Sequence, residues 1–200
     1  ALVGLPRPVL AAIGLALIAG HNLTDGVRPA AFGALAPLWH ALHVPGFLWA
    51  GGVFIAYPLV PWVGVMMLGV AAAEVWTWDA ERRRRLLLTV GATSIAAFAV
   101  LRAMNGYGNP SPWRPQATTA LTIVSFLNVL KYPPSLVFTL WTVGANLLLL
   151  SVLQRAAAWT TATGRWLERL GRAPLVFYIA HLWLFAVVGA VFGFGHGGTP

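Results

Sequence analysis

The chain has 200 residues, of which 58% are hydrophobic and only 9% are charged, and it contains no cysteine. Soluble domains carry roughly 25% charged residues, so this composition indicates a polytopic membrane protein, and the missing cysteines exclude disulfides, thiolate catalysis and cysteine metal sites. The net charge of +8 would suggest nucleic acid as the partner of a soluble protein. Basic loops are expected beside membrane spans, so we expect a lipid bilayer as the partner and no nucleic acid.

Five apolar segments predict an all-α bundle of transmembrane helices in a single domain, residues 1–200. A helix of about 20 residues crosses the ~30 Å hydrocarbon core of a bilayer. The expected spans are about 7–23, 53–74, 86–104, 134–153 and 174–194. A signal peptide is the alternative for the first and shortest of them, but no clean small-residue cleavage site follows it.

Two loops between these spans have unusual compositions. Residues 29–52 contain no charge but include three prolines, which argues against one long spanning helix and favours an interfacial or re-entrant segment. Residues 104–117 contain the pairs Asn-Gly, Asn-Pro and Ser-Pro, which are typical of turns.

The basic residues predict an orientation in a bacterial inner membrane. With five spans, nine basic residues fall on one side and four on the other, and the richer side is expected to be cytoplasmic. The amino terminus of the chain would then be cytoplasmic and the carboxyl terminus outside. The nine are Arg7, Arg82, Arg83, Arg84, Arg85, Arg155, Arg165, Arg169 and Arg172; the four are Arg28, Arg102, Arg114 and Lys131.

Three residues, His181, His21 and Asp25, are candidates for catalysis, and Tyr178 is a candidate for substrate binding beside His181. His181 lies in the last expected span with Tyr178 three residues earlier on the same face, where it could relay a proton or only hold two helices together. His21 and Asp25 are four residues apart, a spacing that could join a base to its orienting carboxylate. Asn22 lies between them as a candidate for substrate binding, and helix capping with a turn is the alternative for all three.

Further substrate-binding candidates lie near the expected outer face. Asn128 and Lys131 are three residues apart and would share a face if that stretch is helical. Arg102 and Asn105 lie at the end of the third expected span. The alternatives are a snorkelling lysine with a helix cap, and turn formation by Asn105.

His40 and His43, added to His21, make a conceivable zinc set, but the spacing is weak without cysteine and we expect no metal. The run Arg82–Arg85 could hold the phosphates of coenzyme A or only contact lipid headgroups.

Six segments in chain order carry a resemblance to a known family. They are HNLTDG, YPLVPWVGVMMLG, RRRRLLL, LRAMNGYGNPSPW, SFLNVLKYPPSLVFTLWTVG and LGRAPLVFYIAHLWL, of which KYPPSL and GRAPLVFYIAHL are the most specific. Together they resemble the carboxyl-terminal half of bacterial membrane proteins related to the heparan-alpha-glucosaminide N-acetyltransferase catalytic domain.

The resemblance implies a transmembrane acyltransferase. Its expected donor is cytoplasmic acyl-CoA, such as acetyl-CoA, and its acceptor is the amine or hydroxyl of a glycan or another small molecule on the far side. The family's amino-terminal spans, including a histidine-bearing catalytic segment, have no counterpart before Ala1. We therefore expect a part of a longer protein that could be inactive alone, and no residue here takes over the role of the family's catalytic base.

Other classes of function stay open. A transporter fragment should show ionisable groups within spans or inverted repeats, whereas here Glu74, at a helix end, is the one acidic residue near a span. A non-catalytic membrane assembly subunit is a further alternative, and so is a homo-oligomer.

Overall fold

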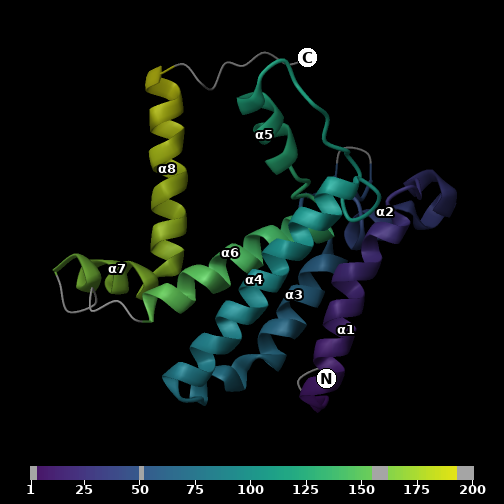
Figure 1. Ribbon diagram of the computed structural model, residues 1–200. Helices are drawn as coiled ribbons and strands as arrows, with labels where there is room; N and C mark the ends of the chain where they lie inside the picture. Colours follow the sequence, from purple (N-terminus) through teal and green to yellow (C-terminus); the bar gives the residue numbers. More distant parts are fainter. Residues whose placement is uncertain (1–3, 50–51, 155–161, 193–200) are drawn as a thin grey trace. The chain divides into compact units, whose positions relative to one another are not determined.

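The computed structural model describes residues 4–49, 52–154 and 162–192 (Figure 1). The chain divides into two units, with the boundary in the sequence between Gln154 and Arg155. The first unit contains α1 (Arg7–Gly20), η2 (His21–Thr24), η3 (Pro29–Leu35), α2 (Ala36–Leu42), β1 (Gly46–Phe47), β2 (Phe54–Ile55), α3 (Leu59–Ala71), η4 (Ala73–Thr77), α4 (Ala80–Met104), α5 (Thr119–Leu127) and α6 (Leu136–Leu153). The second contains α7 (Ala162–Arg172) and α8 (Pro174–Phe192). The predicted all-α fold is confirmed, with one short antiparallel hairpin in the part described.

In the part of the chain that the structure describes, four helical stretches are long and apolar enough to cross a membrane. They are Leu59–Thr77, Ala80–Met104, Leu136–Leu153 and Pro174–Phe192. A fifth candidate is the pair Arg7–Thr24 and Pro29–Leu42, which is bent by 110° at the break between its members. Residues 29–49 form the separate elements η3, α2 and β1, in agreement with the expectation that residues 29–52 do not form one long spanning helix. The prediction of about five spans thus agrees with four such helices, or five if the bent pair is one span; residues 193–194 lie outside the described residues.

Two helix starts differ from the prediction. The second span was expected from residue 53, but Phe54 and Ile55 pair with Gly46 and Phe47, and α3 begins only after Pro58, whose ψ of 142° is extended. The third span was expected from residue 86, but α4 begins at Ala80. The Asp79 carboxylate accepts a hydrogen bond from the backbone N–H of Arg82 at 2.9 Å and so caps the helix before the arginines.

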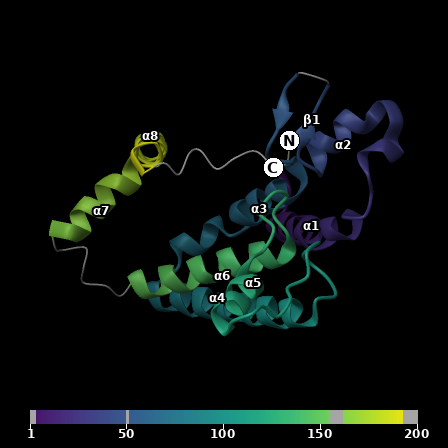
Figure 2. The ribbon, with the colours of Figure 1, turned by 90° about the horizontal axis from the view of Figure 1, so that it is seen from above.

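Glycine contacts join the helices of the first unit in pairs. α1 packs along α3, and α4 packs along α6 (Figures 1 and 2). A methyl group added at Gly14 would lie 2.8 Å from the carbonyl oxygen of Gly64, and one at Gly91 would lie 3.1 Å from that of Gly144. Small residues that let two backbones approach are the usual means of packing helices in membranes, where no hydrophobic effect drives them together.

Gly14→Ala and Gly64→Ala are therefore expected to lower the free energy of unfolding by about 1–3 kcal/mol each, because the added methyl meets a backbone carbonyl that cannot turn away. Gly20 and Gly69 are matched controls on the same two helices, since a methyl group there meets no neighbouring atom within 4 Å. Chemical unfolding in detergent measures the effect. Equal stability of the four alanine variants would contradict this packing.

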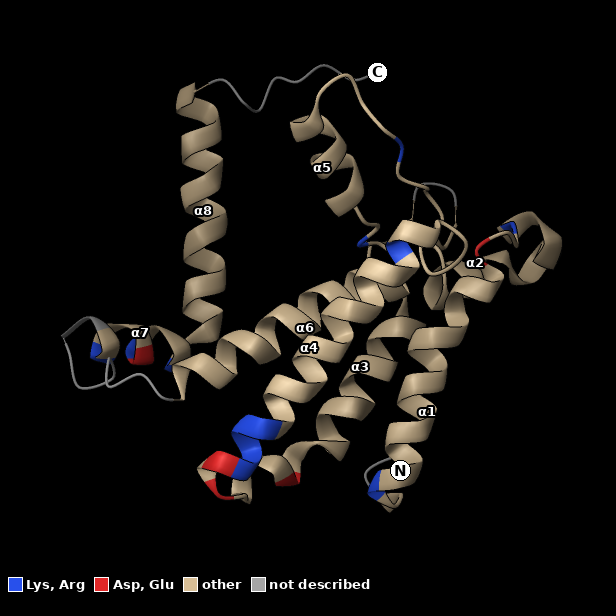
Figure 3. Cartoon of the chain, in the orientation of Figure 1, with Lys and Arg blue, Asp and Glu red and all other residues tan. Residues whose placement is uncertain are grey.

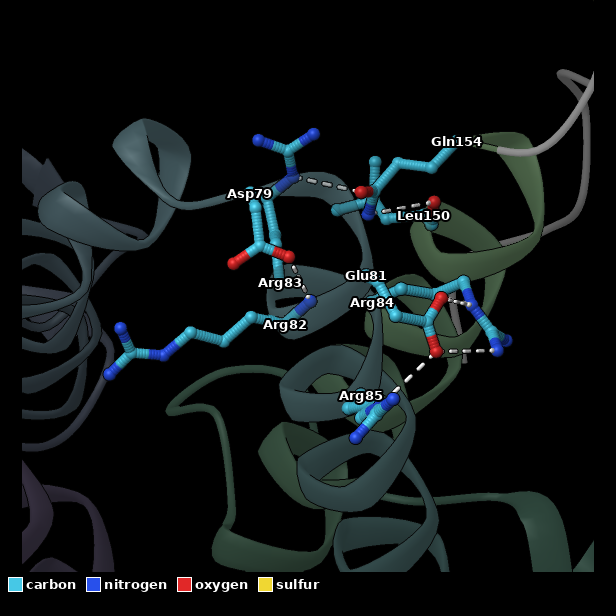
Figure 4. Close-up of polar contacts among 8 residues, drawn as sticks. All are labelled: Asp79, Glu81, Arg82, Arg83, Arg84, Arg85, Leu150 and Gln154. Carbon is cyan, nitrogen blue, oxygen red and sulfur yellow. Dashed lines mark hydrogen bonds and ion pairs between the residues drawn. The ribbon is translucent and has the colours of Figure 1, made fainter.

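Charged residues gather at the two ends of the helices in the first unit, and the lengths between them are uncharged (Figure 3). Arg7 of α1 forms an ion pair with Glu74 of η4. At the same end, Nε of Arg83 donates to Oε1 of Gln154, which follows α6, at 2.8 Å (Figure 4). We call this the arginine end. It brings together Arg7 and Arg82–Arg85, which the sequence had placed on one side of a membrane.

Candidate functional site

Segments far apart in the sequence meet at the end opposite the arginine end. The backbone N–H of Leu136, the first residue of α6, donates to Oδ1 of Asn22 at 2.9 Å. The hydroxyl of Tyr107 donates to the carbonyl of Ala19, and the N–H of Val137 donates to that of Gly108 at 3.1 Å. The HNLTDG, NGYGN and KYPPSL segments thus form one polar region.

Gly108 is suited to its place in this region because its φ of +87° disfavours other residues, and its Cα faces the side chains of Leu136 and Val137. Tyr107 stays protonated there, because partial burial and the nearby Asp25 carboxylate raise the pKa of its phenol.

The histidine cluster consists of His21, Asn22, Thr24, Asp25 and His43, and its first four members lie on or next to η2. The expected bond between His21 and Asp25 is not formed. Instead Nδ2 of Asn22 donates to Oδ2 of Asp25 at 2.7 Å. The reason is local geometry: in a 3₁₀ helix residues three apart are eclipsed, whereas the prediction assumed the four-residue spacing of an α-helix.

His43, which directly follows α2, supplies the partner of Asp25. Its Nε2 lies 3.6 Å from Oδ1 of Asp25 and 3.1 Å from the hydroxyl oxygen of Thr24. Thr24 gives its single hydroxyl proton to the carbonyl of His21 at 2.7 Å, so it can only accept from His43. Nε2 of His43 therefore carries a proton and points it toward Thr24 and the carboxylate. His43 is 2% exposed.

His21 is held in the opposite tautomer. Its Nδ1 lies 2.9 Å from the carbonyl oxygen of Ile18, which can only accept, so Nδ1 carries the proton of the neutral ring. Nε2 is then unprotonated and carries a free lone pair, and the atom is buried without a hydrogen-bond partner in the described structure. The residue is 5% exposed, and its ring meets that of His43 edge-on at 5.9 Å. An imidazole fixed in this way can take a proton.

The remaining member of the conceivable zinc set points elsewhere. Nδ1 of His40 lies 3.1 Å from the carbonyl of Val44, and its ring lies against Gly46. Within the described ranges, no three histidine, aspartate or glutamate side chains are arranged to hold a metal ion.

Arg102 is buried and occupied by backbone carbonyls. Only 3% of the residue is exposed, and its guanidinium donates to the carbonyls of Ser111, Ser125, Phe126 and Asn128 at 2.8–3.0 Å. Three of these acceptors lie at the carboxyl end of α5, where carbonyls lack helical partners. Arg102 thus anchors α5 and the preceding loop to α4, which describes its role better than contact with a substrate.

Three further candidates near the expected outer face were Asn105, which forms a turn, and Asn128 and Lys131, which are exposed. Asn105 has φ of 53° and exchanges two hydrogen bonds of 3.0 Å with the backbone of Trp113, so it closes the turn after α4. The condition under which Asn128 and Lys131 would share a helical face is not met, because α5 ends at Leu127 and the chain is extended at Asn128, with ψ of 97°. Both side chains are exposed, and Nζ of Lys131 lies 5.1 Å from the ring centroid of Tyr132.

His181 and Tyr178 lie together on α8, as predicted, with ring centroids 5.3 Å apart. Nδ1 of His181 lies 3.2 Å from the carbonyl of Phe177. Both side chains line an open hollow of about 500 Å³ in the angle between α7 and α8, which is otherwise apolar.

The arginine end offers a cationic surface. Arg84 and Arg85 contact Glu81, whereas the Arg82 guanidinium lies 4.0 Å from the ring centroid of Trp78 (Figure 4 shows the arginines). Among the described residues Arg82 forms no ion pair, so this guanidinium can receive a phosphate.

The sequence indicated His43 only as a conceivable zinc ligand and not as the partner of Asp25. The one signal was a histidine in an otherwise apolar, uncharged loop, and its partners become visible only once the chain reverses between η2 and α2.

Comparisons with models of protein families, with curated proteins and with solved structures found no match to this chain. The likeness to transmembrane acyltransferases therefore stays a prediction.

Proposed function

We propose that this chain is part of a bacterial inner-membrane acyltransferase that moves an acyl group, such as acetyl, from acyl-CoA to the amine or hydroxyl of a glycan. The arginine end faces the cytoplasm and the histidine cluster faces outward. The four to five apolar helices and the excess of arginine at one end support this placement.

The observation that carries the proposal is the buried, unpartnered Nε2 of His21. In the proposed step the acceptor nitrogen or oxygen attacks the thioester carbonyl carbon, a C–N or C–O bond forms, and the C–S bond breaks. Nε2 takes the proton that the acceptor loses, and the coenzyme A thiolate leaves and is protonated by solvent. The lone pair of His21, fixed by the bond from Nδ1 to Ile18, suits this role.

The donor is bound at the other end in this proposal. Arg82 is suited to a coenzyme A phosphate because its guanidinium is stacked on Trp78 and is free of carboxylates within the described residues. α4 has 25 residues, or ~37 Å at 1.5 Å per residue, and it separates the arginine end from the end that holds the histidine cluster. In this proposal the thioester of a donor bound at Arg82 therefore has to pass between the helices to reach His21.

Incubation of reconstituted protein with labelled acetyl-CoA and a panel of amino sugars and hydroxyl glycans tests the proposal. We expect label in at least one acceptor and stoichiometric release of free coenzyme A. Release without labelled acceptor would indicate hydrolysis, and neither product across the panel would refute the proposed transfer.

A further inference from the structure

α7 separates charged from apolar side chains. At 3.6 residues per turn, Trp166, Leu167 and Leu170 fall on one face, and the opposite face carries Arg165, Glu168, Arg169 and Arg172. Three arginines and one glutamate give this face a net charge of +2, and Glu168 pairs with Arg172 at 2.6 Å. On the apolar face Trp166 is 60% exposed, so its own unit does not cover it.

α8 follows α7 after the single residue Ala173. α8 is apolar all round, since its 18-residue window has a mean hydropathy of 2.3 and none of it is buried within the structure. The two helices are not collinear: Figure 2 looks down the axis of α8 while α7 extends sideways from it, and Figure 1 agrees. If α8 crosses a bilayer, α7 must run along the surface of that bilayer.

We propose that α7 lies in the interface of an anionic membrane, with Trp166, Leu167 and Leu170 between the acyl chains and its arginines against the phosphates of the headgroups. Arginine fits phosphate oxygens in a bidentate geometry, and a helix with arginines opposite tryptophan and leucine suits an anionic lipid surface. The alternative occupant of the apolar face is another protein segment. Such a segment would have to cover α7 directly beside α8, which begins one residue later and would be surrounded by lipid.

This proposal does not depend on acyl transfer. With α7 bound in this way, a lipid-bound helix would precede the amino-terminal end of α8, beside the apolar hollow lined by Leu167, Leu170 and His181.

The absence of cysteine permits single spin labels without further changes to the full chain. Leu167→Cys and Leu170→Cys report on the apolar face, Glu168→Cys reports on the charged face, and Val187→Cys in α8 is the control for insertion. Each variant is reconstituted in phosphatidylcholine vesicles with and without phosphatidylglycerol. Collisions with oxygen, which is enriched in lipid, are compared with collisions with a water-soluble nickel chelate.

We expect oxygen to be favoured at 167, 170 and 187 and nickel at 168, and the labels at 167 and 170 to lie deeper when phosphatidylglycerol is present. Arg169→Gln should reduce this lipid-dependent shift by about half, because it lowers the net charge of the face from +2 to +1, whereas Glu168→Gln should enlarge it. Labels at 167 and 170 that are shielded from both reagents, or that are open to nickel, would overturn the proposal. A depth that does not respond to phosphatidylglycerol would overturn its anionic part.

Discussion

Arg102→Met is expected to lower the free energy of unfolding by about 3 kcal/mol or more. The change leaves four backbone carbonyls without their donor in a site where the residue is only 3% exposed, and a buried unsatisfied group costs about 1–3 kcal/mol. Because three of the acceptors end α5, residues 105–131 should detach first. Thermal unfolding in detergent gives the stability, and limited proteolysis shows where the chain opens.

Arg102→Lys separates geometry from charge, because an ammonium group cannot span four carbonyls as the guanidinium does. We expect its stability to lie between those of wild type and Arg102→Met. Arg114→Met is the matched control, since Arg114 is exposed on the same loop. If Arg102→Met were as stable as Arg114→Met, the anchoring role of Arg102 would be refuted.

His21→Asn is expected to reduce kcat for acyl transfer by about 10²–10⁴-fold, the usual contribution of a general base. The asparagine amide can replace Nδ1 as donor to the carbonyl of Ile18, while the lone pair of Nε2 is lost. The fold should therefore persist when the activity is lost. Rates of label transfer, measured at saturating donor and acceptor, give the change in kcat.

His40→Asn is the matched control, because His40 also bonds a nearby carbonyl through Nδ1 but contacts no member of the histidine cluster among the described contacts. Its kcat should stay within about threefold of wild type, the range expected of a surface change without a catalytic role.

Much of the fold could be predicted from the sequence because lipid demands long apolar helices, and runs such as 134–153 and 174–192 satisfy that demand without reference to the rest of the chain. Helix boundaries were harder. The arginines at 82–85 suggested a loop, yet Asp79 caps the helix ahead of them. Residues 53–58 are apolar enough for a span, but Pro58 and pairing with Gly46–Phe47 keep them extended.

The site was predicted in part. Asn22 and Asp25 do meet, and His21 lies beside them on η2, but the 3₁₀ geometry of η2 and the return of the chain at His43 decide which atoms face each other, and neither follows from spacing. Arg102 was predicted to bind substrate, yet its partners are backbone carbonyls, which leave no mark in a sequence. The two faces of α7, by contrast, could have been found from the period of Trp166, Leu167 and Leu170 alone.

Transfer across the membrane by way of His21 is tested most directly in sealed vesicles that contain the protein. Labelled acetyl-CoA is confined to the side of the membrane that the arginine end faces, and an amino sugar is confined to the opposite side. We expect labelled sugar on the far side with wild type and His40→Asn, and its loss with His21→Asn. Transfer by His21→Asn at the wild-type rate would contradict the role of His21, and loss in His181→Gln instead, with the fold intact, would move the base to α8.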